Sequence, residues 1–495
     1  MRVDAGDWNP RGSGGMLRPV RRRTSGTPGD QRRQVPVINR REFLAASAVT
    51  GLSLLSPSLR NRVEAADARK LRITGIDWDQ VLVPYQAFNR QALFRYHGLS
   101  LQLRTIFQVR TNSDLVGLGE SWGAASMTDA EVASYVGTSP FEWLGARKDL
   151  SLNMALYDLM GKSLGLPSWR LIGPKVRDRI PVAAWTVSRS PEDLAEEVRQ
   201  AAGRGYRWLK YHIDEVHNVI DQTRAMQRVA PKGFRVQLDF NANAEYRDIS
   251  PILKELGRFP VIGRIEDPIQ TGDRDGYRKL IAESDIELLI HHGPVNYLVD
   301  KACDGYMAGH APIGHAIKVA GVSEESGLPF MLQQAGGQIN QAFLAHEVAV
   351  FGGATIDHVN LAHLWTDDVT TSRAKVTGGT IAVPRGPGLG VALDPAKLEK
   401  YKTAPRPGYR PFLIKIVYRG GPTIIVRHDP NKAGCTDNLR FLGRLLKGKV
   451  PGDKIPGPVP GYANAVTSEF LDRKNCGDFD RLWQATARGA VVTGD

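Results

Sequence analysis

Cysteine is scarce in this 495-residue sequence, and no apolar run in it is long. Its three cysteines, Cys303, Cys435 and Cys476, are widely spaced and include no Cys-x-x-Cys pair, which argues against a disulfide scaffold or a zinc ribbon. One disulfide, between Cys435 and Cys476, is conceivable. No apolar stretch could span a bilayer, so we expect no membrane insertion of the mature protein. The remaining composition, with 42% hydrophobic and 24% charged residues, is that of a globular protein.

Negative charge is also in deficit, because the formal net charge is +13. Most of this excess lies before Leu71, where 14 Lys and Arg residues face 6 Asp and Glu residues. The rest of the chain carries +5, which is ordinary for its size, and it shows no RNA-binding or helix-turn-helix pattern. We therefore expect no nucleic-acid partner.

The basic amino-terminal segment resembles a twin-arginine export signal. An Arg40-Arg41 pair is followed by a modest apolar stretch, Phe43 to Leu55, and then by Ala66-Asp67-Ala68, which has the small-x-small form of a signal peptidase site. The resemblance implies that residues 1–68 are a removable signal and leader and that the protein is exported to the periplasm already folded. The alternative is a disordered basic leader with an accidental arginine pair.

Two strands, a hairpin and a helix are expected within residues 69–181. The segments 71–76 and 101–109 alternate with a period of two, as half-buried strands do. A hairpin with a Gly-x-Gly-Glu exit follows at 109–121, and apolar residues recur at helical spacing over 152–162 before Gly165-Leu166-Pro167 ends the helix. Considered alone, these are only a hairpin and a core helix. Together they resemble the amino-terminal domain of the mandelate racemase and muconate lactonising enzyme family, which belongs to the enolase superfamily.

Helices and strands alternate from residue 182 to about residue 365, for example a helix at 191–202 and a strand at 208–213. Repeated βα units with short connections predict a closed parallel barrel whose active site lies at the carboxyl ends of the strands. The segment from Val383 to Val391 resembles the end of the family's barrel. The resemblance thus implies an α/β fold, a modified TIM (β/α) barrel over 182–400 with an α+β capping domain over 69–181.

Residues 401–495 resemble nothing in that family and form a C-terminal extension. The segments 412–418 and 423–427 are strand-like, and a basic helix is expected near 438–447. The extension could form an appended module, cover an edge or support oligomer contacts. We expect a homo-oligomer.

Two carboxylates follow neighbouring predicted strands. Asp239 and Asn241 end the strand 234–238 and, being two residues apart, point to the same face. Glu266 ends the next strand, in Ile265-Glu266-Asp267-Pro268. These segments resemble the family's "D-x-N" and "I-E-x-P" motifs, so the resemblance makes Asp239 and Glu266 ligands of one divalent metal, Mg²⁺ in relatives, and Asn241 a substrate-binding residue. The alternative is that each is only a polar strand cap.

The third metal ligand departs from the family pattern. Relatives carry Glu or Asp at the next strand end, whereas this chain has His291-His292-Gly293-Pro294. Matching the glycine places Pro294 at the ligand position, while matching the spacing places His292 there, and His291 is the neighbouring alternative. A histidine ligand would favour a transition metal such as Zn²⁺, Mn²⁺ or Fe²⁺. Two hydrogen-bonded barrel histidines are the alternative interpretation.

The preceding strand end supplies an expected base. Lys210 and His212 have i, i+2 spacing, so both turn inward, and they resemble the family's "K-x-K" with its second lysine replaced. The resemblance implies that His212 removes a proton α to a carboxylate while Lys210 orients it or balances charge. On the opposite wall, Tyr306 or His310 could act as acid, and Gln333 could bind substrate.

These residues lead to a functional expectation with open alternatives. We expect a small carboxylate substrate and a metal-dependent lyase that dehydrates a sugar-derived acid, because one base and a weak acid suffice for elimination. A racemase, epimerase or cycloisomerase is the second enzyme hypothesis, and it would need a further acid or base on the far wall. The third hypothesis is a degenerate member that binds a ligand or supports an assembly without turnover.

Overall fold

The computed structural model describes residues 70–97, 102–407, 410–418, 421–429 and 466–493. The chain divides into two units, Met1–Arg60 and Asn61–Asp495, and every described residue belongs to the second. The predicted export signal, Cys435 and the predicted basic helix near 438–447 lie outside the described residues. Among the described residues, no helix is long and apolar enough to cross a membrane.

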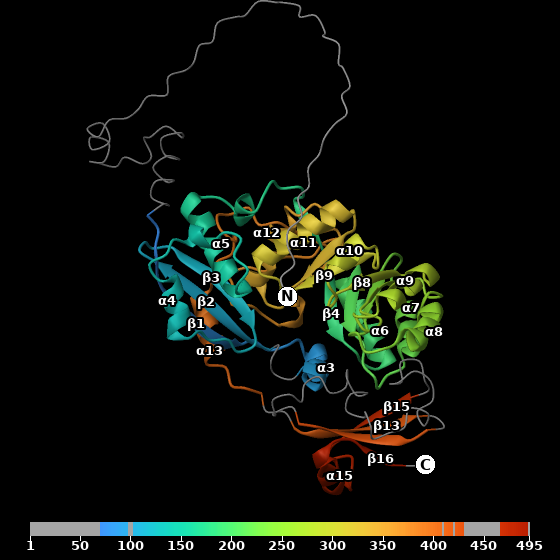
Figure 1. Ribbon diagram of the computed structural model, residues 1–495. Coiled ribbons are helices and arrows are strands. Elements are labelled where there is room, and N and C mark those ends of the chain that lie inside the picture. The colour runs from blue at the N-terminus through green and yellow to red at the C-terminus, as the bar shows by residue number, and fades with distance from the viewer. Residues whose placement is uncertain (1–69, 98–101, 408–409, 419–420, 430–465, 494–495) are drawn as a thin grey trace, which may run out of the picture. The chain divides into compact units, whose positions relative to one another are not determined.

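A three-stranded antiparallel sheet packed against helices forms the capping domain (Figure 1). Its elements are β1 (Ile73–Leu82), α3 (Ala87–His97), β2 (Leu103–Thr111), β3 (Val116–Trp122), α4 (Asp129–Tyr135), the 3₁₀ turn η2 (Pro140–Trp143), α5 (Leu150–Leu164) and η3 (Ser168–Leu171). The predicted Gly-x-Gly exit lets α5 approach β3. A Cβ on Gly117 or Gly119 would lie 2.2 or 2.1 Å from the backbone oxygen of Ala155 or Ser151, so only glycine fits.

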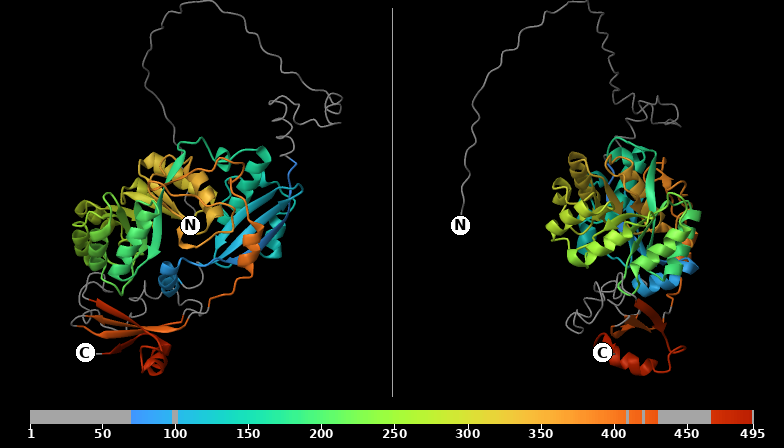
Figure 2. Two further views of the ribbon diagram at one scale, coloured as in Figure 1. Left: turned by 180° about the vertical axis from the view of Figure 1, so that it is seen from behind. Right: turned by 90° about the vertical axis from the view of Figure 1, so that its right-hand side faces the viewer.

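Eight parallel strands close into a barrel in the order β4 to β11, with β11 pairing back to β4. The strands are β4 (Arg179–Val187), β5 (Trp208–His212), β6 (Arg235–Asp239), β7 (Ile262–Glu266), β8 (Glu287–Ile290), β9 (Gly305–Gly309), β10 (Phe330–Gln333) and β11 (His358–Val359). Helices α6 (Pro191–Gly203), α7 (Val219–Val229), α8 (Tyr246–Leu256), α9 (Arg274–Glu283), α10 (Asn296–Val299), α11 (Ile313–Ser326) and α12 (Gln338–Val348) connect and surround them (Figures 1 and 2). The turn η4 (Ala362–Leu364), the antiparallel strand β12 (Thr380–Ala382) and α13 (Pro395–Lys402) follow. The predicted fold class is confirmed.

The strand register places the carboxyl ends of β5, β6 and β7 at one level. His212 pairs with Asp239, and Asp239 pairs with Glu266. Glu266 in turn pairs with Leu289 of β8, so the chain reaches His291 just beyond that level. The polar side chains that the sequence placed at strand ends are therefore gathered at one end of the barrel.

A buried ion cluster joins the capping domain to the barrel. Arg104 of β2 places Nη1 2.6 Å from Glu120 Oε1 and 3.1 Å from Asp368 Oδ2, and all three side chains are inaccessible to solvent. Glu120, the last residue of the predicted Gly-x-Gly-Glu exit, also accepts hydrogen bonds from the backbone N–H groups of Gly337 and Asn340. The cap is thus fixed to the barrel by paired buried charges.

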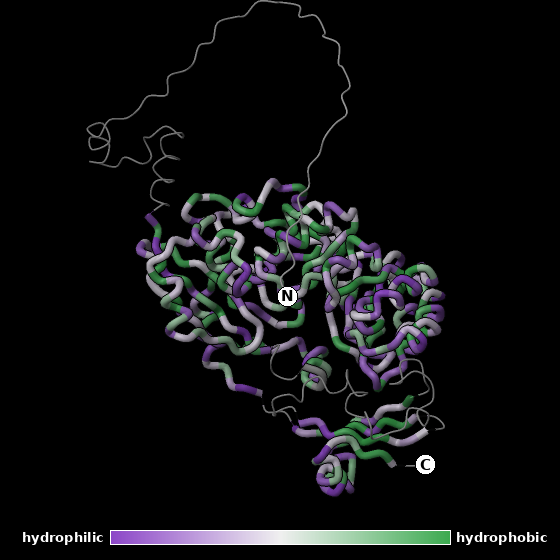
Figure 3. Tube along the Cα trace, viewed as in Figure 1, coloured by the Kyte–Doolittle hydropathy of each residue, from purple (hydrophilic) through white to green (hydrophobic). Residues whose placement is uncertain are grey.

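The C-terminal extension forms an antiparallel sheet in the order β15-β13-β14-β16. Its elements are β13 (Phe412–Tyr418), β14 (Thr423–His428), β15 (Val466–Leu471), α15 (Phe479–Ala485), η6 (Thr486–Arg488) and β16 (Val491–Thr493). Apolar residues, coloured green in Figure 3, run along its strands. Ile414 and Ile416 on one face belong to the main core, while Leu413 and Leu471 on the other pack with Phe479 of α15. Both faces of this sheet are therefore covered in part.

Candidate active site

A buried lysine lies at the centre of the polar residues at the barrel mouth. The Nζ atom of Lys210 lies 2.7 Å from Glu266 Oε2 and 3.3 Å from Asp239 Oδ2. It also donates a hydrogen bond to Gln333 Oε1 at 2.6 Å and lies 3.5 Å from the sulfur of Met307. Because Lys210 and Glu266 are fully buried, a single ammonium group is shared by two carboxylates in a site with little water.

The pKa values of the Asp239 and Glu266 carboxyl groups are shifted in opposite directions. Burial and the neighbouring charge of Glu266 raise the pKa of the Asp239 carboxyl above its ordinary value, although Lys210 opposes this shift. Burial alone would also raise the pKa of Glu266, but Lys210 and His291 outweigh it and hold that pKa below its ordinary value. Asp239 is therefore the carboxyl of the pair that takes up a proton first.

His212 stands beside Asp239 at the end of β5. Its Nε2 atom lies 3.1 Å from Asp239 Oδ2. The ring of Trp185 packs edge-on against the imidazole, with centroids 5.3 Å apart and an interplanar angle of 82°. The predicted i, i+2 pair thus turns inward together, and both members contact Asp239.

The two consecutive histidines face different carboxylates. His291 Nδ1 lies 3.4 Å from Glu266 Oε1. His292 Nδ1 lies 2.5 Å from Asp267 Oδ2, and the His292 side chain is 57% exposed. Asp267 also accepts hydrogen bonds from both histidine backbone N–H groups, so this carboxylate shapes the turn. The hydrogen bond to Asp267 raises the pKa of His292 despite its partial burial.

The other predicted site residues, Tyr306, Asn241 and His310, have different surroundings. The Tyr306 hydroxyl donates to the carbonyl oxygen of Gly293 at 3.4 Å, and burial raises its pKa. Asn241 turns its side-chain amide back to the backbone oxygen of Asp239 at 3.1 Å, with a positive φ of 54°. His310 is kept neutral, because burial and then the charges of His291 and Lys210 lower its pKa to about 4.

The structure therefore brings together Lys210, His212, Asp239, Glu266 and Gln333. His292 lies with Asp267 instead, and Tyr306 and Asn241 bond to backbone oxygens. The catalytic, metal-binding and substrate-binding roles assigned to these residues stay predictions.

Comparison with known proteins identifies the lineage of this barrel. Residues 193–397 match the family model described as enolase C-terminal domain-like. D-gluconate dehydratase of Thermoproteus tenax is 26% identical over 286 residues, which cover 52% of this chain and 56% of that protein. Chloromuconate cycloisomerase of Pseudomonas putida is 26% identical over 282 residues, covering 51% of this chain and 72% of that protein.

The chain belongs to the enolase superfamily. A solved muconate lactonizing enzyme from Pseudomonas fluorescens, in complex with muconolactone, shares the fold at 21% identity and a TM-score of 0.56, over 67% of this chain and 99% of that one. An isomerase from Streptomyces coelicolor A3(2) has a TM-score of 0.55 at 24% identity, over 67% and 97% of the two chains. The sequence match spans only about half of the gluconate dehydratase, so it establishes descent and not activity.

Two groups of residues could hold the divalent cation that enolase-superfamily members generally bind. The first is Asp239 and Glu266 with His291 as a third donor. Glu266 Oε1 and His291 Nδ1 are buried, lie 3.4 Å apart and have no hydrogen-bond partner within the described ranges, so two ligand-type atoms stand unsatisfied side by side. The second is Asp267, His291 and His292, whose ligand atoms all lie within 4.8 Å of one another. Both donor sets fit a divalent cation, and their imidazoles favour a transition metal over Mg²⁺.

Sequence reasoning missed three contacting residues. Gln237 donates its Nε2 to Glu266 Oε2 at 2.7 Å, and its position two residues before Asp239 could have placed it on the inward face. Met307 reaches Lys210 from β9, where an apolar residue gave no signal. Asp267 adopts a positive φ of 43°, and no local sequence pattern predicted that its side chain would point toward the two histidines.

Proposed function

We propose that this protein dehydrates a sugar-derived acid by removing the proton α to its carboxylate. The observation that carries the proposal is the convergence of Lys210, His212 and two carboxylates at the carboxyl ends of adjacent barrel strands. Named relatives in the same superfamily include D-gluconate and D-galactonate dehydratases, which support a lyase of this class.

His212 is the proposed base. A proton α to an ionised carboxylate is very weakly acidic, so its removal requires positive charge where negative charge develops. The ammonium of Lys210 is preorganised for this role because its three acceptors fix it in a dry site. Asp239, 3.1 Å from His212 Nε2, orients the imidazole and stabilises its protonated form.

The leaving hydroxide requires a proton from the opposite side. Burial raises the pKa of Tyr306, so its hydroxyl stays protonated near neutral pH and can supply that proton. His310 has its pKa lowered to about 4 by burial, so it is neutral and cannot act as an imidazolium donor. Tyr306 is therefore the proposed acid, and Gln333, which contacts Lys210, is the proposed substrate-binding residue.

The proposed cation would be held by Asp239, Glu266 and His291, or by Asp267, His291 and His292. When bound, a divalent cation supplies positive charge beside the substrate carboxylate. The imidazole donors favour Zn²⁺, Mn²⁺ or Fe²⁺.

A screen of sugar-derived acids tests the proposal. The purified protein, supplied in turn with Mg²⁺, Mn²⁺ and Zn²⁺, is incubated with each acid, and 2-keto-3-deoxy products are detected as semicarbazones by absorbance. We expect at least one substrate, and a loss in kcat of about 10²–10⁴-fold in His212→Asn. The matched control is His315→Asn, which changes an exposed histidine of α11 and should leave the rate unaltered. Turnover that survives in His212→Asn would remove His212 from the mechanism.

One observation favours a second function, ligand binding without turnover. The Lys210 ammonium already lies between Asp239 and Glu266, and the segment directly after β8, His291-His292-Gly293-Pro294, holds no carboxylate. Calorimetric binding of an acid that is never converted with any of the three metals would favour this function.

An epimerase or cycloisomerase would instead yield an isomeric product of unchanged mass, which mass spectrometry of the same reactions separates from dehydration.

A further inference from the structure

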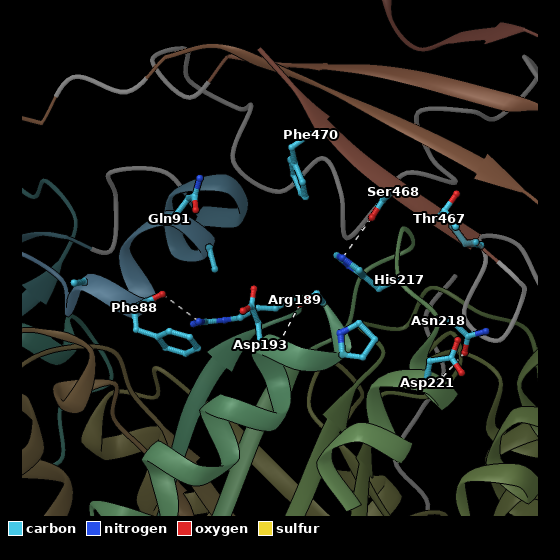
Figure 4. A pocket seen from close by; sticks show the side chains of 15 residues that line it. Phe88, Gln91, Arg189, Asp193, His217, Asn218, Asp221, Thr467, Ser468 and Phe470 are labelled. Atoms are coloured by element: carbon cyan, nitrogen blue, oxygen red, sulfur yellow. Dashed lines mark hydrogen bonds between the residues drawn. The ribbon is translucent and has the colours of Figure 1, made fainter. Parts of the chain in front are cut away.

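A pocket of about 640 Å³ lies beyond the carboxyl ends of β4 and β5 (Figure 4). Its walls come from α3 of the cap, from the loops that follow β4 and β5, and from β15 of the C-terminal extension. None of the residues that surround Lys210 lines it. Its volume is that of a small-molecule site, and the barrel chemistry described above leaves it unexplained.

A buried carboxylate orients a histidine in this pocket. His217 Nδ1 lies 2.8 Å from Asp214 Oδ2, and Asp214 Oδ1 accepts hydrogen bonds from the backbone N–H groups of Val216 and His217. Burial alone would raise the pKa of Asp214, but His217 and these hydrogen bonds outweigh it and hold the pKa below its ordinary value. The carboxylate therefore fixes the Nδ1–H tautomer, which leaves Nε2 as the acceptor.

A serine from the distant extension meets that acceptor. Ser468 Oγ lies 3.5 Å from His217 Nε2, across 251 positions of the chain, as the dashed line in Figure 4 marks. Ser468 pairs with Ile416 of β13 and is partly exposed, whereas its neighbours Thr467 and Glu469 are exposed. Ser468, His217 and Asp214 are thus linked in the order nucleophile, base and orienting carboxylate, and Ser468 and His217 line the pocket.

We propose that Ser468, His217 and Asp214 form a second catalytic site that hydrolyses carboxylic esters. The Ser468 oxygen bonds to the ester carbonyl carbon while its proton passes to His217 Nε2. The bond to the alcohol then breaks, and the alcohol leaves with that proton. Water repeats the sequence on the acyl-serine, which releases the acid and restores the serine.

The lining of the pocket selects a neutral ester with a small apolar group. Phe88 and Phe470 supply apolar surface, while Asp193 places negative charge on the lining and disfavours anions. Asp221, also on the lining, is paired with Arg224 at 2.6 Å. Arg189, the one arginine of the lining, is committed to Glu197 at 3.2 Å. Helix α7 begins two residues after His217, so the positive end of its dipole lies close to the base along the chain.

The first test is covalent labelling of the full-length protein with a biotinylated fluorophosphonate. We expect one adduct per chain by intact mass, mapped by peptide mass spectrometry to Ser468. His217→Gln should abolish the adduct, because the serine loses its base, whereas Thr493→Ala changes an exposed hydroxyl of β16 that does not line the pocket and should leave labelling intact. An unlabelled protein, or an adduct on another residue, would overturn the proposal.

The second test is hydrolysis of p-nitrophenyl butyrate. We expect turnover that falls by at least about 100-fold in Ser468→Ala and in Asp214→Asn, with Thr493→Ala as the control. Circular dichroism and thermal unfolding show whether each variant folds. If a variant fails to fold, the mapped adduct on the unmodified chain decides the question without it. A rate that Ser468→Ala leaves unchanged would contradict the assignment.

Discussion

Replacing Lys210 by Met tests the charge arrangement at the barrel mouth. The substitution keeps an unbranched apolar stem and removes the ammonium from between two buried carboxylates, 2.7 Å from Glu266 and 3.3 Å from Asp239. With an effective dielectric constant near 20, these separations correspond to attractions of about 6 and about 5 kcal/mol. Desolvation offsets most of this attraction, and removal of one partner from a buried ion pair costs about 3–5 kcal/mol. We therefore expect the free energy of unfolding at pH 8 to fall by about 3–5 kcal/mol.

The dependence of this loss on pH follows from the carboxyl groups. Without the ammonium, the pKa values of Asp239 and Glu266 rise in the folded variant, because burial and their mutual repulsion both oppose ionisation. A group whose folded pKa is raised binds protons more readily in the folded than in the unfolded state, so the variant gains stability as pH falls. The difference between parent and variant should therefore be smaller at pH 5.5 than at pH 8.

Urea unfolding followed by circular dichroism at both pH values measures the effect. The matched control is Lys232→Met, which removes an exposed lysine and should change stability by less than about 0.5 kcal/mol. A loss below about 1 kcal/mol for Lys210→Met, or a loss equal at both pH values, would refute the shared-ammonium arrangement.

Two further predictions concern the buried polar core. Burial lowers the pKa of His358 to about 3, so protonation of the unfolded chain costs stability as pH falls below about 6.5. His358→Gln removes this cost. The difference in free energy of unfolding between the parent and the variant, measured by urea titration, should therefore shrink by about 2 kcal/mol between pH 7.5 and pH 5. A difference that is the same at both pH values would contradict the assignment. Arg104→Met leaves Glu120 and Asp368 buried without their cation and should cost about 3–5 kcal/mol at pH 7, measured by thermal unfolding. A loss under about 1 kcal/mol would show that the cap is held by other contacts.

Much of the barrel could be predicted because its signals are local. Parallel strands with polar residues at their carboxyl ends give a pattern that can be recognised in a single sequence. The i, i+2 spacing of Lys210 and His212 correctly predicted that both side chains point inward. The Gly-x-Gly-Glu exit of the hairpin was also visible in the sequence, but the close approach of α5 to its glycines and the anchoring of the cap by Glu120 emerged only from the structure.

The directions of loop side chains could not be predicted in this way. His291 and His292 follow a strand that has already ended, so no periodicity says which of them faces Glu266. That outcome depends on the turn that Asp267 forms with their backbone N–H groups. Strand-like segments of the extension were visible in the sequence, but the meeting of Ser468 with His217 depends on tertiary packing across 251 positions.

Proton exchange in heavy water is the most direct test of the central claim, that the barrel mouth removes a proton α to a carboxylate. Sugar-derived acids are incubated in D₂O with the protein and Mg²⁺, Mn²⁺ or Zn²⁺, and loss of the α-proton signal is followed by proton NMR. We predict deuterium at C3 of the 2-keto-3-deoxy product, where the enol takes up a solvent deuteron, or at the α carbon of recovered substrate, with the parent protein and with His315→Asn. Both signals should be lost with His212→Asn. Full retention of the α-proton in every acid with every metal would contradict the account and leave a binding protein on an enolase-superfamily scaffold.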